Sequence, residues 1–187
     1  MKRLITCVVL VFYSLIVIAP NLSECDRAAL NARFIENYKQ IKYEIEFNRF
    51  INHLGLKESN NDWTIINSIN CMGEWQFSYR TLKHLGYAYF TPKQFKTDPS
   101  IFPRAIQLDA LHALIKTNLY ELRYHLDYIG MEIKGTTITK AGLIAASHLG
   151  GAGSVRLYLE SFGSIDKRDI YGTKISDYIK EFSLYNL

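Results

Sequence analysis

Glu58 is the residue whose type and setting in the sequence best suit chemistry. It ends a segment with an apolar pattern, and Ser59 and the polar run 60–62 (Asn-Asn-Asp) follow it directly. Because Asn and Asp favour loops, we expect Glu58 to lie where a helix gives way to a loop. A carboxyl group at such a boundary can give and take a proton during the cleavage of a bond.

Two further patches stand out from an ordinary helical pattern. The first is Gly73-x-x-Gln76-Phe77, and the second is the segment 145–155, which reads Ala-Ala-Ser-His-Leu-Gly-Gly-Ala-Gly-Ser-Val. In this order and at these separations, the three patches resemble the lysozyme-like lytic transglycosylases, whose superfamily also holds the goose-type lysozymes. The resemblance covers residues 50–159, and the Glu58-Ser59 pair is its most specific part.

The resemblance implies an enzyme that cleaves the glycan strands of peptidoglycan without a cofactor or a metal. Glu58 would protonate the glycosidic oxygen between N-acetylmuramic acid and N-acetylglucosamine. As a base, it would then help the muramic acid C6 hydroxyl attack its own anomeric carbon, giving a 1,6-anhydro sugar. One carboxyl group suffices because the substrate supplies the nucleophile, whereas most glycosidases use two carboxyl groups.

The resemblance also implies five residues that contact the substrate. Ser59 and Gln76 are expected to orient the sugar or the carboxylate through hydrogen bonds, and Trp75 is expected to stack on a sugar face. Ser147 and His148 stand where the family usually has Tyr-Asn, so His148 is a candidate for that polar role.

The family's tyrosine at this place commonly lies against the catalytic Glu. If another tyrosine replaces it, Tyr79 and Tyr87 are the candidates, and the sequence does not rank them.

Two other functions remain open from the sequence. A lysozyme-type hydrolase would use a second carboxylate, for which Asp62 is the reserve, and Glu74 is the rival of Glu58 as the catalytic carboxylate. The missing Tyr-Asn pair also suits a protein that binds glycan without cleaving it. A hydrolase would release a reducing-end sugar, which is one water heavier than the anhydro product.

The N-terminus predicts export. Residues 1–24 begin with Met-Lys-Arg and continue with an uncharged apolar run, which is the layout of a signal peptide or of an N-terminal membrane anchor. We therefore expect residues 25–187 to form the functional domain, in the periplasm or cell envelope, with membrane attachment as an alternative. Cys25 is a candidate for lipidation or for a disulfide with Cys71, although we expect Cys71 to be a buried free thiol.

Composition excludes several other classes. A chain of 187 residues is long enough for one domain with a core, and we expect a monomer. The formal charge of +4 is small and no basic stripe carries interleaved aromatics, so we do not expect nucleic-acid binding. The five His are scattered singly and no Cys-x-x-Cys occurs, so the sequence offers no metal framework.

Periodicity predicts a mainly α fold, and the resemblance implies that it is of the α+β lysozyme-like kind, with a cleft. A minor β element is expected near residues 64–69, and the glycine-rich residues 150–153 are expected to form a corner between helices. Helical spacing extends over residues 26–56, read as two helices or as one with a bend near 43–46, and over 75–85, 106–129, 140–149, 154–161 and 175–182.

Overall fold

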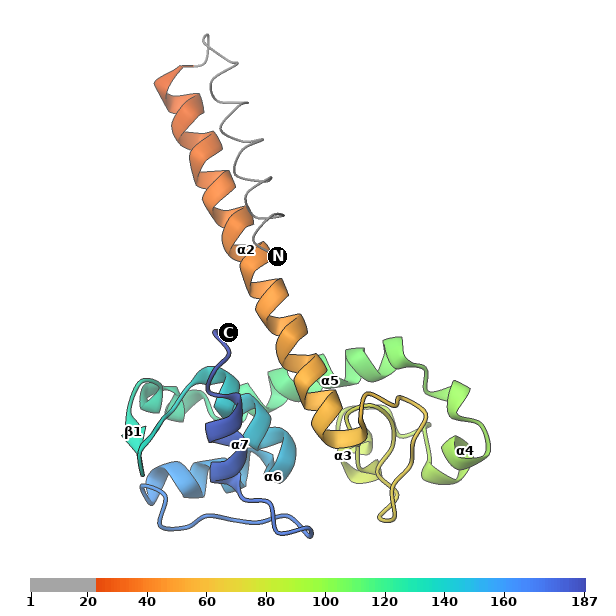
Figure 1. Cartoon of the computed structure of the whole chain (residues 1–187). Helices are drawn as coiled ribbons and strands as arrows, with labels where there is room; N and C mark the ends of the chain where they lie inside the picture. The colour runs from red at the N-terminus through yellow and green to blue at the C-terminus, as the bar shows by residue number, and fades with distance from the viewer. Residues whose placement is uncertain (1–22) are drawn as a thin grey trace. The chain divides into compact units, whose positions relative to one another are not determined.

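The computed structural model describes residues 23–187 (Figure 1). Helices dominate this part of the chain, which confirms the predicted mainly α class. Within residues 23–187, regular strands occur only as β1 (Glu132–Ile133) and β2 (Thr136–Thr137), which pair antiparallel. The predicted signal peptide, residues 1–24, lies almost wholly outside the described residues.

The described chain divides into two units at residue 45, residues 23–45 and 46–187, and helix α2 (Glu24–Ser59) contributes to both. In the first unit, the Ser23 hydroxyl caps the helix by accepting a hydrogen bond from the Asp26 amide at 3.2 Å. Cys25 is an exposed free thiol in the first turn. No helix of residues 23–187 is both long and apolar enough to cross a bilayer.

Helix α2 has no break at the expected bend near residues 43–46. The prediction of a bend was wrong because no Pro or Gly occurs between residues 26 and 54 to interrupt the backbone hydrogen bonds. The shift in the apolar stripe marks instead where burial begins. Phe50, Ile51 and Leu54 are buried, whereas apolar residues earlier in the helix are at most partly covered.

Gly55 lets the segment after α2 fold back against the helix. A Cβ at this position would lie 2.6 Å from Asn61 Oδ1 and 2.9 Å from Glu74 Cγ, so no other residue fits without displacing them. The returning segment holds the isolated bridges of Met72 with Ile66 and with Phe77. The β element expected near residues 64–69 is therefore reduced to a single bridge at Ile66.

The middle of the chain is a series of short helices followed by one long one. The helix expected at 75–85 begins only at Tyr79, because Ser78 caps it with a side-chain bond to the Thr81 amide. The helix expected at 106–129 ends early and continues as a 3-10 turn. The elements are α3 (Tyr79–His84), α4 (Pro92–Thr97), η1 (Pro99–Ile101), α5 (Arg104–Glu121) and η2 (Arg123–Tyr128).

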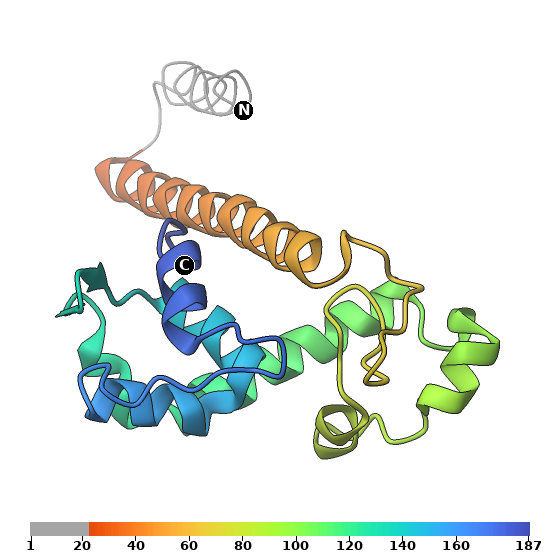
Figure 2. The same ribbon diagram turned by 60° about the horizontal axis from the view of Figure 1, so that its bottom comes forward.

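Helix α6 (Lys140–Glu160) packs against α5 and against α7 (Ile175–Phe182), as Figures 1 and 2 show. A Cβ on Gly142 would lie 2.8 Å from the Ile179 carbonyl oxygen, which confirms that the small residues of this stretch allow close packing. The predicted corner at 150–153 is a kink within α6, at Gly151 with φ 76°. The last predicted helix, 175–182, is confirmed as α7.

Candidate functional site

Glu58 is the penultimate residue of α2, at the predicted helix-loop boundary. Its side chain is 16% exposed and lines a cavity of about 320 Å³. Two polar groups from distant helices approach the same carboxyl oxygen. The Tyr178 hydroxyl donates a hydrogen bond to Oε1 at 2.6 Å, and His148 Nε2 lies 4.0 Å from Oε1.

Tyr178 is a residue of the candidate site that sequence reasoning missed. Burial, and after it the negative charge of Glu58, raises the pKa of Tyr178, so the phenol keeps its proton and donates to the carboxyl group. The candidates from the sequence were wrong: Tyr79 donates to the Ala88 carbonyl oxygen at 3.1 Å, and Tyr87 packs on Phe90. The signal for Tyr178 was its place on an amphipathic helix, which alone indicates only packing.

One ring nitrogen of His148 forms a hydrogen bond, and the other has no hydrogen-bond partner among residues 23–187. Nε2 lies 2.8 Å from the Trp75 carbonyl oxygen, and because a carbonyl only accepts, Nε2 carries the hydrogen. Nδ1 is buried and has no hydrogen-bond partner among the described residues. The prediction that His148 lies near Glu58 is consistent with this geometry, and its neighbour Ser147 donates to the Leu143 carbonyl oxygen at 2.7 Å.

Gln76 lines the Glu58 cavity, as the sequence suggested. Its backbone has φ 48°, a left-handed conformation that costs free energy in a residue other than glycine. Its Nε2 donates to the Gly73 carbonyl oxygen at 2.8 Å, whereas its Oε1 is buried without a partner among residues 23–187. An acceptor left open beside a carboxyl group suits a ligand that supplies a hydroxyl or an amide hydrogen.

Ser59 and Trp75 do not line this cavity; the burial of Trp75 contradicts its predicted stacking on a sugar, whereas the contact predicted for Ser59 stays a prediction. The Ser59 hydroxyl lies 2.8 Å from the Glu74 carbonyl oxygen, to which it donates, and accepts from the Asp62 amide at 3.1 Å. Trp75 is fully buried, its indole N–H donates to the Ile51 carbonyl oxygen at 3.0 Å, and neither ring face is open to a ligand.

The reserve carboxylates also lie elsewhere. Glu74 is 1% exposed, and the Arg104 guanidinium binds both of its oxygens, one of them at 2.9 Å. Asp62 is exposed and accepts hydrogen bonds from Thr64, whose hydroxyl first and backbone amide second lower the pKa of Asp62. Neither residue lines the cavity.

Asp169 is the second carboxylate that the cavity does contain. Its Oδ1 accepts hydrogen bonds from the Tyr171 and Thr173 amides at 2.9 and 2.8 Å. Nothing in the spacing of the sequence marks Asp169 as a site residue. The loop 169–171 forms one wall of the cavity and the loop 67–71 forms another, and the Ser68 and Tyr171 hydroxyls lie 3.3 Å apart.

Cys71 is half-buried on the same wall and is a free thiol. Burial, with a smaller contribution from the charge of Glu58, raises the pKa of Cys71, whereas a hydrogen bond with Asn67 opposes the shift. A thiol held in its neutral form is a poor nucleophile. Among residues 23–187, no group of three or more His, Cys, Asp or Glu is placed to hold a metal ion.

Comparisons of the chain with models of protein families, with characterised proteins and with solved structures found no match.

Proposed function

We propose that this protein is an exported lytic transglycosylase of the lysozyme-like fold that cleaves peptidoglycan with Glu58 as its general acid and base. The observation that carries the proposal is the setting of the Glu58 carboxyl group. It is partly buried in a cavity, held by the Tyr178 hydroxyl at 2.6 Å, and accompanied there by the unpartnered Gln76 Oε1. The proposed substrate is the β-1,4 bond between N-acetylmuramic acid and N-acetylglucosamine.

In the proposed reaction, protonated Glu58 gives its proton to the glycosidic oxygen as the bond to the anomeric carbon breaks. The resulting carboxylate then accepts the proton of the muramic acid C6 hydroxyl, whose oxygen bonds to the anomeric carbon and closes the 1,6-anhydro ring. The Tyr178 hydroxyl fixes one carboxyl oxygen throughout, which leaves the other for proton transfer. Gln76 Oε1 would accept a hydrogen bond from the sugar.

The experiment is digestion of purified peptidoglycan by the wild type and by Glu58→Gln, with mass spectrometry of the released fragments. The wild type is expected to release 1,6-anhydro products, and Glu58→Gln is expected to release almost none. Asp62→Asn is the matched control, because Asp62 is an exposed carboxylate just beyond the same helix end. Equal release by Glu58→Gln and wild type would refute the role of Glu58, and binding without release would favour a non-catalytic glycan-binding protein.

A hydrolase is the second candidate, and Asp169 is the observation that favours it. Asp169 lines the cavity with Glu58, so the chain has a second carboxylate with which to activate water or stabilise positive charge at the anomeric carbon. Fragments that are one water heavier than the anhydro sugars would identify this outcome. Their loss in Asp169→Asn, with anhydro products unaffected, would assign the water-dependent reaction to Asp169.

A further inference from the structure

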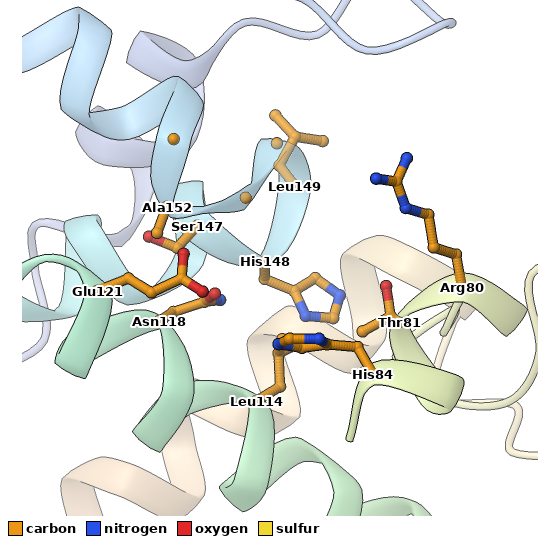
Figure 3. A pocket seen from close by; sticks show the side chains of 13 residues that line it. Arg80, Thr81, His84, Leu114, Asn118, Glu121, Ser147, His148, Leu149 and Ala152 are labelled. Atoms are coloured by element: carbon orange, nitrogen blue, oxygen red, sulfur yellow. The ribbon is translucent and has the colours of Figure 1, made fainter. Parts of the chain in front are cut away.

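A second cavity, of about 480 Å³, adjoins the Glu58 cavity. The two share His148 and Leu149 as lining residues, so a ligand that fills one lies against the wall of the other. The rest of the second cavity is formed by side chains of α3 and α5 and by the kinked part of α6, as Figure 3 shows. The proposed cleavage reaction uses none of the groups on α3 and α5.

Asn118 of α5 indicates that this cavity receives a polar ligand. Asn118 is only 7% exposed, and it lines the cavity. No side-chain hydrogen bond within residues 23–187 involves its amide. The amide of Asn118 can therefore donate to and accept from a ligand in the cavity that carries matching groups. Arg80 and Glu121 also line the cavity. Neither forms an ion pair with another of residues 23–187, so both charged groups are open to a ligand.

The charges around the cavity differ in sign from one wall to the other. Arg80 and His84 come from α3, whereas Asn118 and Glu121 come from α5, and Figure 3 draws the two pairs on different sides of the cavity. A guanidinium binds a carboxylate with paired hydrogen bonds. A carboxylate and an amide oxygen accept hydrogen bonds from an ammonium group or from peptide N–H groups. The lining therefore fits a ligand that carries both kinds of group, as a short peptide does.

At the kink of α6, the helix backbone itself is accessible to a ligand in the cavity. Gly151 and Gly153 line the cavity, and a Cβ added to either would meet no atom within 4 Å. The wall at these positions therefore has no side chain between the helix backbone and the cavity. An extended chain can approach such a wall closely.

We propose that the second cavity binds the short peptide carried by the muramic acid of the substrate. The peptide's carboxylate lies at Arg80, and its amine or amide groups lie at Asn118 and Glu121. This inference rests on the proposed function for the glycan part of the ligand, since the shared wall of His148 and Leu149 would bring the peptide beside a sugar bound at Glu58.

The test measures cleavage of two glycan preparations and binding of the free peptide. One preparation keeps its peptides, the other has lost them to an amidase, and the released peptide is titrated into the full chain by calorimetry. The variants are Arg80→Gln, which removes the cation, and Gly153→Leu, which fills the cavity without a clash at Cβ. Lys83→Gln is the matched control, because Lys83 is an exposed cation on α3 that does not line the cavity.

The wild type is expected to bind the peptide and to cleave peptide-bearing strands with a kcat/KM about tenfold above that for stripped strands. Arg80→Gln and Gly153→Leu are expected to lose this preference and the peptide binding, and Lys83→Gln to keep both. Equal cleavage of both preparations by the wild type, without peptide binding, would overturn the peptide site and leave the lytic activity standing. Peptide binding that Arg80→Gln abolishes, with neither preparation cleaved, would support the site and overturn the lytic activity.

Discussion

Tyr178 Oη lies 2.6 Å from Glu58 Oε1, and this hydrogen bond joins helix α7 to the end of α2. The Lys57 ammonium nitrogen lies 5.0 Å from the centroid of the Tyr178 ring, which adds a cation to one face of the phenol. The carboxyl group is thereby held by a residue far away in the sequence. Its orientation consequently depends on how α7 packs.

Replacing Tyr178 with Phe is expected to lower kcat for glycan cleavage by about ten- to a hundredfold, because the carboxyl group loses the donor that fixes its orientation. KM should change little, since Tyr178 is not a lining residue of the cavity. Tyr185→Phe is the matched control, because it removes a hydroxyl that lies 3.1 Å from His53 Nδ1, in another hydrogen bond to α2. Steady-state cleavage rates check this, and full activity in Tyr178→Phe would contradict it.

The raised pKa of Tyr178 predicts how stability depends on alkaline pH. Its folded-state pKa lies above the ordinary value of 10.0, so the unfolded chain loses the phenol proton first as the pH rises. The free energy of unfolding is therefore expected to hold below about pH 10 and to fall above it, by about 1.4 kcal/mol per pH unit for each such tyrosine. Denaturant titrations between pH 8 and 11 measure the slope. Tyr178→Phe should make it shallower, and an unchanged slope would refute the assignment.

Local patterns in the sequence were enough to locate Glu58 and most of the helices. The polar run after Glu58 places it at a helix end, and the spacing of apolar residues in 175–182 gives α7. Gln76 and His148 line the cavity with Glu58, and their contact with a substrate stays a prediction. For Glu58 and α7 the information lies within a few residues of chain, where helix periodicity and turn preferences act, whereas Gln76 and His148 were singled out by the resemblance of their segments to a known family.

The remaining site residues depend on contacts between distant segments. Tyr178 reaches Glu58, and Asp169 reaches the cavity, only because α7 packs on α6 and the loop before it folds back. Trp75 cannot stack on a sugar because its indole is buried in the core. Its neighbours in the sequence do not reveal this burial. Periodicity predicts that a residue lies on the buried face of a helix, but it does not predict which residue of another segment contacts it.

Arg104 is expected to stabilise the fold by neutralising the buried Glu74. Arg104→Met should lower the free energy of unfolding by about 3 kcal/mol, because it leaves a carboxylate that is 1% exposed without its cation. Adding Glu74→Leu should recover most of the loss, since the unpaired charge is then gone. Urea denaturation of the single and double variants checks both statements. A double variant as unstable as Arg104→Met would show that the pair has another role.

Gly73→Ala is expected to destabilise the protein by about 3 kcal/mol through two separate effects. Its φ of +79° is unfavourable for alanine, and a Cβ there would lie 2.1 Å from Gln107 Oε1. Gln107 cannot retreat freely, because its side chain accepts from the Glu74 amide at 2.8 Å and donates to the Phe102 carbonyl oxygen at 2.7 Å. Gly172→Ala is the matched control, because Gly172 has φ +88° and its added Cβ would meet no atom within 4 Å.

The control should therefore cost only the backbone strain, about 1 kcal/mol, and the difference between the two variants measures the clash with Gln107. Thermal or urea unfolding of both variants gives this difference. Because Gln107 ties the segment containing Gly73 and Glu74 to α5, Gly73→Ala should also displace Gln76 and lower glycan cleavage, whereas Gly172→Ala should lower it less. Equal losses of stability in the two variants would mean that Gln107 gives way at no cost, and that its hydrogen bonds do not hold this wall of the cavity in place.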